Sequence, residues 1–395
     1  MSVNENEPYR VMVVDDSLVI RGIINRMVQS DPMIKVVKSV SNGEMAVNEV
    51  KADKSIEIVI LDIEMPVKDG ITALPEIVQA NQNIQVIMSS TLTEHNAEIS
   101  MRALSLGACD YVTKPTSTTT LNSDKVYQSE LIEKIKTFGA RARKRRLTAT
   151  AAPAQPISTV KKDGKSNIDK LADIKHEKLV GNEQASGEGR SLYDGEFKTV
   201  KPNFKIVPEI LAIGSSTGGP PALFKIFEQI GTSIRQPIVL TQHMPATFTK
   251  ILAEHIAKIS GKEAMEGQDG MLIEAGKVYV APGGYHMVVE KKEGNHKILR
   301  INSDPPENFC RPAVDPMFRS VAKAYGPKAL ALVLTGMGCD GAKGAKVIYD
   351  AGGNVVAQDE ATSVVWGMPG ATAHMGVCCS VLPLNDIVAY LKSVM

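Results

Sequence analysis

Short apolar runs rich in β-branched residues alternate with amphipathic stretches along most of this chain, and this alternation constrains its fold more than any other feature. From Tyr9 to about Leu121 the amphipathic stretches include Ile20–Val28 and Ile99–Leu106. The apolar runs between them are Val11–Val14, Ile34–Val37, Ile58–Leu61 and Val86–Met88. Repeated βα units of this kind predict a doubly wound parallel sheet of five strands, in the α/β class.

The same alternation returns at Ile206 and continues to the C-terminus. Helical patterns such as Leu223–Ile230 and Ile251–Ile259 separate a second set of apolar runs. These runs are Ile210–Ile213, Ile238–Leu240, Val278–Val280, Ala329–Leu334 and Val355–Ala357. We predict a second doubly wound, mainly parallel α/β domain, with an antiparallel hairpin at Val288–Ile301 that turns near Gly294-Asn295.

The alternation of apolar and amphipathic stretches stops between these two regions. Thr148–Pro156 consists of Ala, Thr, Pro and Gln, and Lys161–Glu188 is mostly charged and polar. Such a composition cannot bury enough apolar surface to form a core. A length of 395 residues fits two domains of ordinary size. We therefore predict one domain at residues 1–139, a flexible linker at 140–202 and a second domain at 203–395.

Charge and composition restrict the possible partners. A net charge of +1 provides no overall field that would attract nucleic acid or an anionic membrane. The polar segment Met1–Tyr9 lacks the order of a signal peptide, and no apolar run has bilayer length. The five cysteines follow no metal-ligand spacing. We expect a cytoplasmic protein with reduced thiols, without nucleic-acid binding or membrane insertion.

Polar residues gather where the strands of the first domain end. Asp15 and Asp16 follow one strand, Asp62 follows another, and Ser90 and Lys114 follow two more. In a parallel sheet these ends meet at one edge, where ligands bind. Clustered carboxylates attract a hard cation such as Mg²⁺, and the carboxylate of Asp62 can attack phosphorus. A single such Asp is more often a helix cap, and a lone Lys-Pro is more often a turn, but the convergence of five residues favours a phosphoryl site.

The first domain resembles two-component receiver domains. The resemblance rests on Asp15-Asp16-Ser17, Leu61-Asp62-Ile63-Glu64-Met65-Pro66, Asp69-Gly70 and Lys114-Pro115. It implies Mg²⁺ on Asp16 and Asp62 with the main-chain carbonyl of Glu64, and phosphorylation of Asp62 by a histidine kinase. It also implies phosphate binding by Ser90 and Lys114, with Tyr111 as the switch aromatic.

A glycine-rich loop, Gly214–Gly219, follows the first strand of the second domain and opens a helix. Glycines allow the backbone to approach a substrate closely, and a helix N-terminus favours developing negative charge, so Ser216 is placed as a nucleophile would be. Taken alone, this loop is more often a nucleotide site or a tightly packed turn. His243 and Asp340 each follow a later strand and reach the same edge, where they can serve as base and orienting carboxylate.

The second domain resembles the chemotaxis protein-glutamate methylesterases. The shared motifs are Gly-Ser-Ser216-Thr-Gly-Gly, Thr-Gln-His243-Met-Pro, Val-Ala-Pro-Gly, Arg311-Pro-Ala-Val-Asp315 and Leu-Thr-Gly-Met-Gly-Cys-Asp340-Gly. The resemblance implies Ser216 as nucleophile, His243 as general base and then acid, and Asp340 as orienter. Ser215 and Cys339 depart from the family pattern, and Cys339 raises the question of which group is reactive. A buried cysteine usually behaves as a small hydrophobic residue, and Ser216 keeps the assignment because it directly precedes Thr-Gly-Gly.

The resemblance also names the reaction and the partners. It implies hydrolysis of glutamate methyl esters and deamidation of selected glutamines on chemoreceptors, with no cofactor for ester hydrolysis. It further implies that the receiver restrains the esterase until Asp62 is phosphorylated. Two other functions are possible for a receiver joined to an α/β domain: a nucleotide-binding module, which would shift the melting temperature when nucleotide is added, and a DNA-binding regulator, which would show salt-dependent DNA binding.

Overall fold

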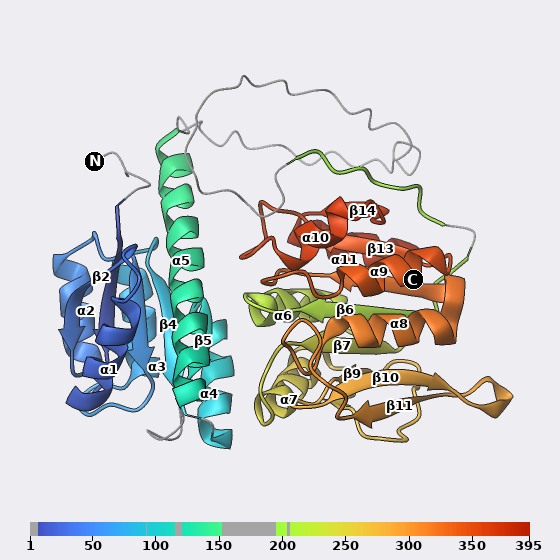
Figure 1. Ribbon diagram of the computed structural model, residues 1–395, viewed down its shortest axis with the longest axis horizontal. Helices are drawn as coiled ribbons and strands as arrows, with labels where there is room; N and C mark the ends of the chain where they lie inside the picture. Colours follow the sequence, from blue (N-terminus) through green and yellow to red (C-terminus); the bar gives the residue numbers. More distant parts are fainter. Residues whose placement is uncertain (1–6, 92, 115–120, 152–194, 204–205) are drawn as a thin grey trace, which may run out of the picture.

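The computed structural model describes residues 7–91, 93–114, 121–151, 195–203 and 206–395. Two α/β domains lie side by side, and the long helix α5 belongs to the first of them (Figure 1). Among the helices of these residues, none combines the length and the apolar character needed to cross a bilayer.

The first domain is the predicted five-stranded parallel sheet. Its strands are β1 Tyr9–Val14, β2 Ile34–Val40, β3 Ile58–Asp62, β4 Gln85–Ser90 and β5 Asp110–Thr113. They lie in the order β2-β1-β3-β4-β5, and every pair is parallel. The helices are α1 Leu18–Val28, α2 Gly43–Ala52, α3 Gly70–Ala80, α4 Glu94–Ser105 and α5 Leu121–Ala151. Because β1 and β3 are neighbours, Asp15, Asp16 and Asp62 meet at the carboxyl edge.

Side-chain caps define where the helices of the first domain begin. Ser17 accepts the N–H of Ile20 at the start of α1, and Asp69 accepts the N–H of Thr72 at the start of α3. Gly70 follows Asp69 because a Cβ at this position would lie 2.0 Å from the main-chain oxygen of Asp62. The Asp69-Gly70 motif therefore packs α3 directly against the end of β3.

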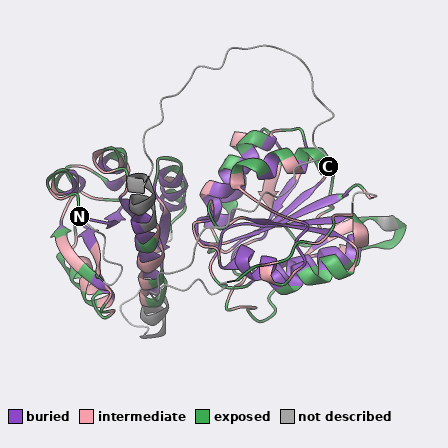
Figure 2. Ribbon diagram, turned by 90° about the horizontal axis from the view of Figure 1, so that it is seen from above, coloured by how far each residue is buried: buried purple, intermediate pink, exposed green. Residues whose placement is uncertain are grey.

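The second domain has a seven-stranded sheet in the order β14-β13-β12-β6-β7-β9-β8, and all its pairs are parallel. Its strands are β6 Ile210–Ser215, β7 Ile238–Gln242, β8 Ala264–Glu266, β9 Val278–Val280, β12 Ala329–Val333, β13 Asn354–Gln358 and β14 Ser380–Leu382. The helices are α6 Gly219–Ile230, α7 Phe248–Ser260, α8 Val314–Tyr325, α9 Ala342–Asp350, α10 Met368–His374 and α11 Leu384–Val394. Figure 2 shows the buried strands enclosed between partly exposed helices.

The predicted antiparallel hairpin forms a separate two-stranded sheet. It consists of β10 His286–Lys291 and β11 Lys297–Asn302, joined by the 3₁₀ turn η1 Glu293–Asn295. Gly294 has a φ of 71°, a conformation that glycine adopts without a steric penalty. A second 3₁₀ turn, η2 Gly326–Lys328, leads into β12.

The structure describes residues at both ends of the segment predicted as the linker. Helix α5 continues through residue 140 to Ala151, and Arg143 pairs with Glu57 of the receiver at 2.6 Å. The N–H of Val200 donates to the carbonyl of Cys378, so the other end is attached to the second domain. The predicted boundary at 139 thus falls inside α5, and the basic run after Gly139 continues this helix. Residues 152–194 lie outside the described residues.

The two domains contact each other through α4 and β5 of the first and α6 and α7 of the second. The ring of Tyr111 stacks on Phe248 with centroids 4.5 Å apart and an angle of 9° between the planes. Lys250 on α7 pairs with Glu94 on α4 at 2.7 Å. The predicted switch aromatic therefore lies in the domain interface.

Candidate active site and phosphoryl site

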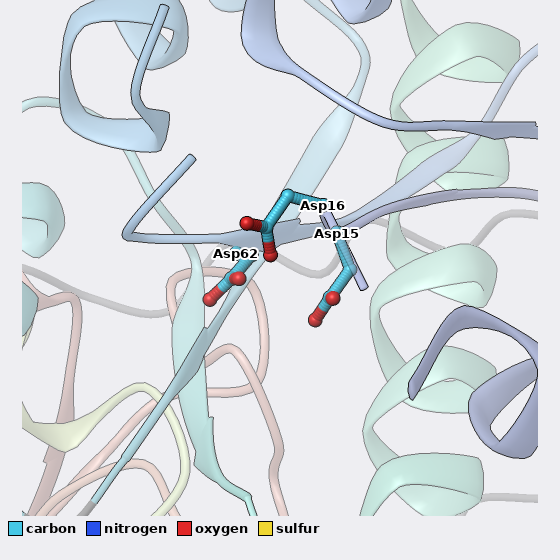
Figure 3. A group of neighbouring side chains, drawn as sticks. All are labelled: Asp15, Asp16 and Asp62. Atoms are coloured by element: carbon cyan, nitrogen blue, oxygen red, sulfur yellow. The ribbon is translucent and has the colours of Figure 1, made fainter. Parts of the chain in front are cut away.

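Three carboxylates and one ammonium group meet at the carboxyl edge of the first sheet. Asp15, Asp16 and Asp62 can each offer one oxygen within 4.8 Å of the others, and Figure 3 shows their side chains clustered at the ends of β1 and β3. The Lys114 ammonium lies 2.7 Å from Asp15 Oδ2 and 2.7 Å from Asp62 Oδ1. Four of the five residues predicted for this edge are thus brought together.

Burial dominates the electrostatics of Asp62. It raises the pKa of this carboxyl to about 6, although Lys114 opposes the shift; the neighbouring charge of Asp15 adds to it. Burial also disfavours the charged form of Lys114, but the carboxylates of Asp62 and Asp15 outweigh it and raise the pKa of the ammonium. A hard divalent cation binds where negative charge is in excess and oxygen atoms can serve as ligands. The carboxylate cluster offers both, so it fits Mg²⁺.

The side chains of Ser90 and Tyr111 have partners other than the acidic cluster. The buried hydroxyl of Ser90 donates to the carbonyl of Thr91, and within the described residues it forms no hydrogen bond to Asp62 or Lys114. Tyr111 is buried on the other side of β5, against Phe248. Glu64 is exposed beside the cluster and lines the same pocket.

A second group of side chains gathers at the carboxyl edge of the seven-stranded sheet. The imidazole of His243, just after β7, donates from Nε2 to Asp340 Oδ2 at 2.7 Å. Asp340 lies in the loop between β12 and α9 and is 1% exposed. Ser216 follows β6 and lines the same cleft as His243. Within the described residues, its hydroxyl forms no hydrogen bond with the imidazole.

Main-chain donors hold Asp340 in place. Its carboxylate accepts the N–H groups of Val314, Asp315 and Gly341 at 2.6, 3.0 and 3.0 Å. Burial alone would raise its pKa, but the hydrogen bonds from His243 and the main chain lower it. The carboxylate is therefore ionised and fixed in orientation, as a group that directs an imidazole must be.

The cleft contains two residues that the motifs did not identify as functional. The amide of Asn308 donates to Asp340 Oδ1 at 2.9 Å and to Asp315 Oδ2 at 3.1 Å, and so joins two buried carboxylates. The Sγ atom of Cys310 lies 3.4 Å from His243 Nδ1. The sequence raised the question of a reactive thiol for Cys339, which is exposed instead. The signal for Cys310 was its position directly before the Arg311-Pro-Ala-Val-Asp315 motif.

His243 is protonated more readily than an ordinary histidine. Burial would lower its pKa, but the hydrogen bonds to Asp340 and Cys310 outweigh burial and raise the pKa to about 9. The cleft around it has a volume of about 810 Å³, and both domains line it. Tyr111 and helix α5 contribute the receiver side, through Ser129, Glu130, Glu133 and Lys134.

Comparison with known proteins matches both domains to families. The CheB methylesterase family matches residues 211–391, and the response regulator receiver domain family matches residues 11–124. A protein-glutamate methylesterase/protein-glutamine glutaminase of Rhodospirillum rubrum is 51% identical over 97% of this chain and 94% of its own length. Proteins of the same name from Paramagnetospirillum magneticum and Azospirillum brasilense are 49% and 46% identical, over 97% and 98% of this chain and 95% and 92% of their own lengths. The chain therefore belongs to the CheB methylesterase family and carries an N-terminal receiver domain.

Proposed function

We propose that this chain hydrolyses glutamate methyl esters, and deamidates selected glutamines, on chemoreceptors during chemotaxis adaptation. In this proposal Ser216 is the nucleophile, His243 the general base and then acid, and Asp340 the group that orients the imidazole. The observation that carries the proposal is the 2.7 Å hydrogen bond between His243 and Asp340 in the cleft that Ser216 lines. The names of the relatives support the substrate class.

The hydrogen bond between His243 and Asp340 supports one ring nitrogen as the base. Because Nε2 of His243 donates to Asp340, Nδ1 is the nitrogen that receives the proton of Ser216. The fixed carboxylate stabilises the imidazolium that results. Asp340 therefore needs no proton of its own at any stage.

The reaction passes through a covalent intermediate. Ser216 Oγ attacks the side-chain carbonyl of the glutamyl ester, methanol leaves with a proton from His243, and water then releases the glutamate from Ser216. With glutamine the leaving group is ammonia. These steps use protein groups and water, without a cofactor.

The oxyanion requires main-chain donors near Ser216. The first turn of α6 contains Pro220 and Pro221, which have no N–H, and the N–H of Gly219 donates to the carbonyl of Ser216. The N–H groups of Thr217 and Gly218 form no hydrogen bond within the described residues. They are the donors we assign to the oxyanion.

Mass spectrometry of receptor glutamates, together with methanol release, tests this assignment. Ser216→Ala and His243→Ala should lower turnover by several orders of magnitude, and Asp340→Asn by somewhat less. Ser215→Ala is the matched control, because the Ser215 hydroxyl donates to buried Gln242 at 2.7 Å rather than facing the cleft. Near-native turnover in Ser216→Ala would reject the nucleophile.

The receiver supplies the control. We assign Mg²⁺ to Asp15, Asp16, Asp62 and the main-chain carbonyl of Glu64, where it would neutralise the carboxylates and the incoming phosphoryl charge. Asp62 is the phosphorylated residue and a chemotaxis histidine kinase the phosphodonor. Ser90 and Lys114 would bind the phosphate, which requires Ser90 to turn from the Thr91 carbonyl.

The restraint follows from the shared cleft. Receiver side chains line the cavity at Ser216, so a receptor helix must displace them to reach the nucleophile. Lys114 directly follows β5, the strand that carries Tyr111, so we expect a phosphate that binds Lys114 to shift this strand and disturb the stack on Phe248. A small phosphodonor with Mg²⁺ should raise methanol release from the full chain, and Asp62→Ala should not respond. Equal rates for the full chain and a fragment beginning near Lys201 would contradict the restraint.

A further inference from the structure

Cys310 is the outer member of a thiol, imidazole and carboxylate chain. Its Sγ lies 3.4 Å from His243 Nδ1, and His243 Nε2 lies 2.7 Å from Asp340 Oδ2. The thiol is partly exposed and lines the cleft. An imidazole held by a buried carboxylate is placed to accept the proton of a neighbouring thiol as its sulfur attacks an electrophile.

The loop that carries Cys310 fixes this contact. The main chains of Glu307 and Cys310 exchange two hydrogen bonds, of 2.9 and 3.1 Å, and so close a tight turn. The two residues between them, Asn308 and Phe309, have φ values of 51° and 64°, in the left-handed region that non-glycine residues rarely adopt. The Asn308 amide anchors the turn to Asp340. Asn308 therefore links the turn that positions the thiol to the carboxylate that holds the imidazole.

Three other cysteines differ from Cys310 in their surroundings. Burial raises the pKa of the Cys378 and Cys379 thiols. Cys339 is exposed beside Asp340, and its described hydrogen bond is made by its main-chain carbonyl, which accepts the N–H of Ala342. Cys310 therefore combines access from the cleft with an imidazole partner.

We propose that Cys310 is a modification site for small-molecule disulfides, and that a mixed disulfide at Cys310 shuts off ester hydrolysis. In the reaction the Cys310 sulfur forms a bond to one sulfur of the disulfide, and the original S–S bond breaks. The departing thiolate takes the proton from His243 and leaves as a thiol. Cys310 is oxidised and the small disulfide is reduced, so no further oxidant is needed.

The loss of activity follows from the position of the adduct. A group attached to Sγ lies against Nδ1 of His243, which is the nitrogen that we assign to the proton of Ser216. It also fills part of the cleft that the substrate helix must enter. The modification itself depends on geometry alone, whereas the inhibition rests on the proposed function of His243.

Dithiodipyridine, a disulfide whose released thiol absorbs light, tests the proposal on the reduced full-length chain. Near neutral pH, peptide mapping should find the adduct on Cys310 first, at a rate roughly tenfold or more above that of Cys339. Methanol release should fall in proportion to the adduct, and dithiothreitol should restore it. His243→Ala should slow modification of Cys310.

Two cysteine variants distinguish modification at Cys310 from the loss of activity that it causes. For each variant, the methanol release of the treated sample is compared with that of the untreated sample. Cys310→Ala should resist inactivation, and Cys339→Ala should be inactivated like the parent chain. Modification of Cys339 ahead of Cys310, or an unchanged Cys310 rate in His243→Ala, would overturn the site. Full modification of Cys310 with undiminished methanol release would overturn the inhibition. If Cys310→Ala does not fold, the mapping, the activity loss and its reversal in the parent chain still decide both points.

Discussion

The buried charge of Asp62 should make the receiver less stable than its own amide variant when no divalent cation is present. Asp62 is 6% exposed, and the pKa of its carboxyl is raised to about 6 mainly by burial. Asp62→Asn replaces the ionised carboxylate with a neutral group of the same shape. We expect the variant to be more stable than the parent chain at neutral pH in the presence of a chelator.

The size of the effect follows from the pKa. The shift from 3.8 to about 6 already includes the opposing attraction of Lys114, so it represents a net penalty on the ionised form. At about 1.4 kcal/mol per pH unit the penalty is about 3 kcal/mol. Because the pKa is higher in the folded state, the penalty is complete above about pH 6 and disappears as the pH falls to 3.8. The advantage of Asp62→Asn should therefore disappear in acid.

Hydrogen exchange of β3 amides in the full chain measures this difference. The chain has one tryptophan, Trp366 in the second domain, so tryptophan fluorescence would not report on the receiver. Mg²⁺ should stabilise the parent chain more than Asp62→Asn. Asp16→Asn is the matched control, since exposed Asp16 should change little in chelator. The reasoning would be refuted if the Asp62→Asn variant were no more stable than the parent chain at neutral pH in the presence of a chelator.

Three other predictions follow from the structure. Glu94→Lys and Lys250→Glu should each raise methanol release of the unphosphorylated chain by up to roughly fivefold, because each replaces an interdomain ion pair with two like charges. The double variant that swaps both charges should restore the low rate. The pKa of about 9 for His243 predicts that kcat/KM of the same chain rises with pH up to about 9; a plateau at neutral pH would contradict it. Gly70→Ala should destabilise the receiver by about 1–3 kcal/mol in hydrogen exchange, because its Cβ would meet the Asp62 carbonyl.

The sequence predicted the sheets because their strands are buried on both faces. The runs Val11–Val14 and Ile58–Leu61 are apolar throughout, as strands covered by helices on both sides must be. Short edge strands such as β8 and β14 are only partly buried, and no run of the apolar pattern marked them. The predicted end of the receiver falls inside α5 for a related reason. The basic residues after Gly139 look solvent-exposed in sequence, whereas Arg143 is buried through its pair with Glu57.

The two sites differ in how many of their residues could be predicted from the sequence. Each predicted residue of the acidic cluster directly follows a strand, and parallel strands bring their ends together whatever the loops do. His243 and Asp340 were predicted by the same rule, and their side chains are 2.7 Å apart in the structure.

Cys310 follows no strand of either sheet. It reaches His243 across 67 residues because Asn308 and Phe309 adopt left-handed conformations that nothing in their residue types demands. Cys339, one residue from Asp340 in sequence, is directed to the surface by the turn at Gly338 and Gly341, both with positive φ. Adjacency in sequence to Asp340 drew attention to Cys339, whereas the backbone of another loop brings the thiol of Cys310 to the imidazole.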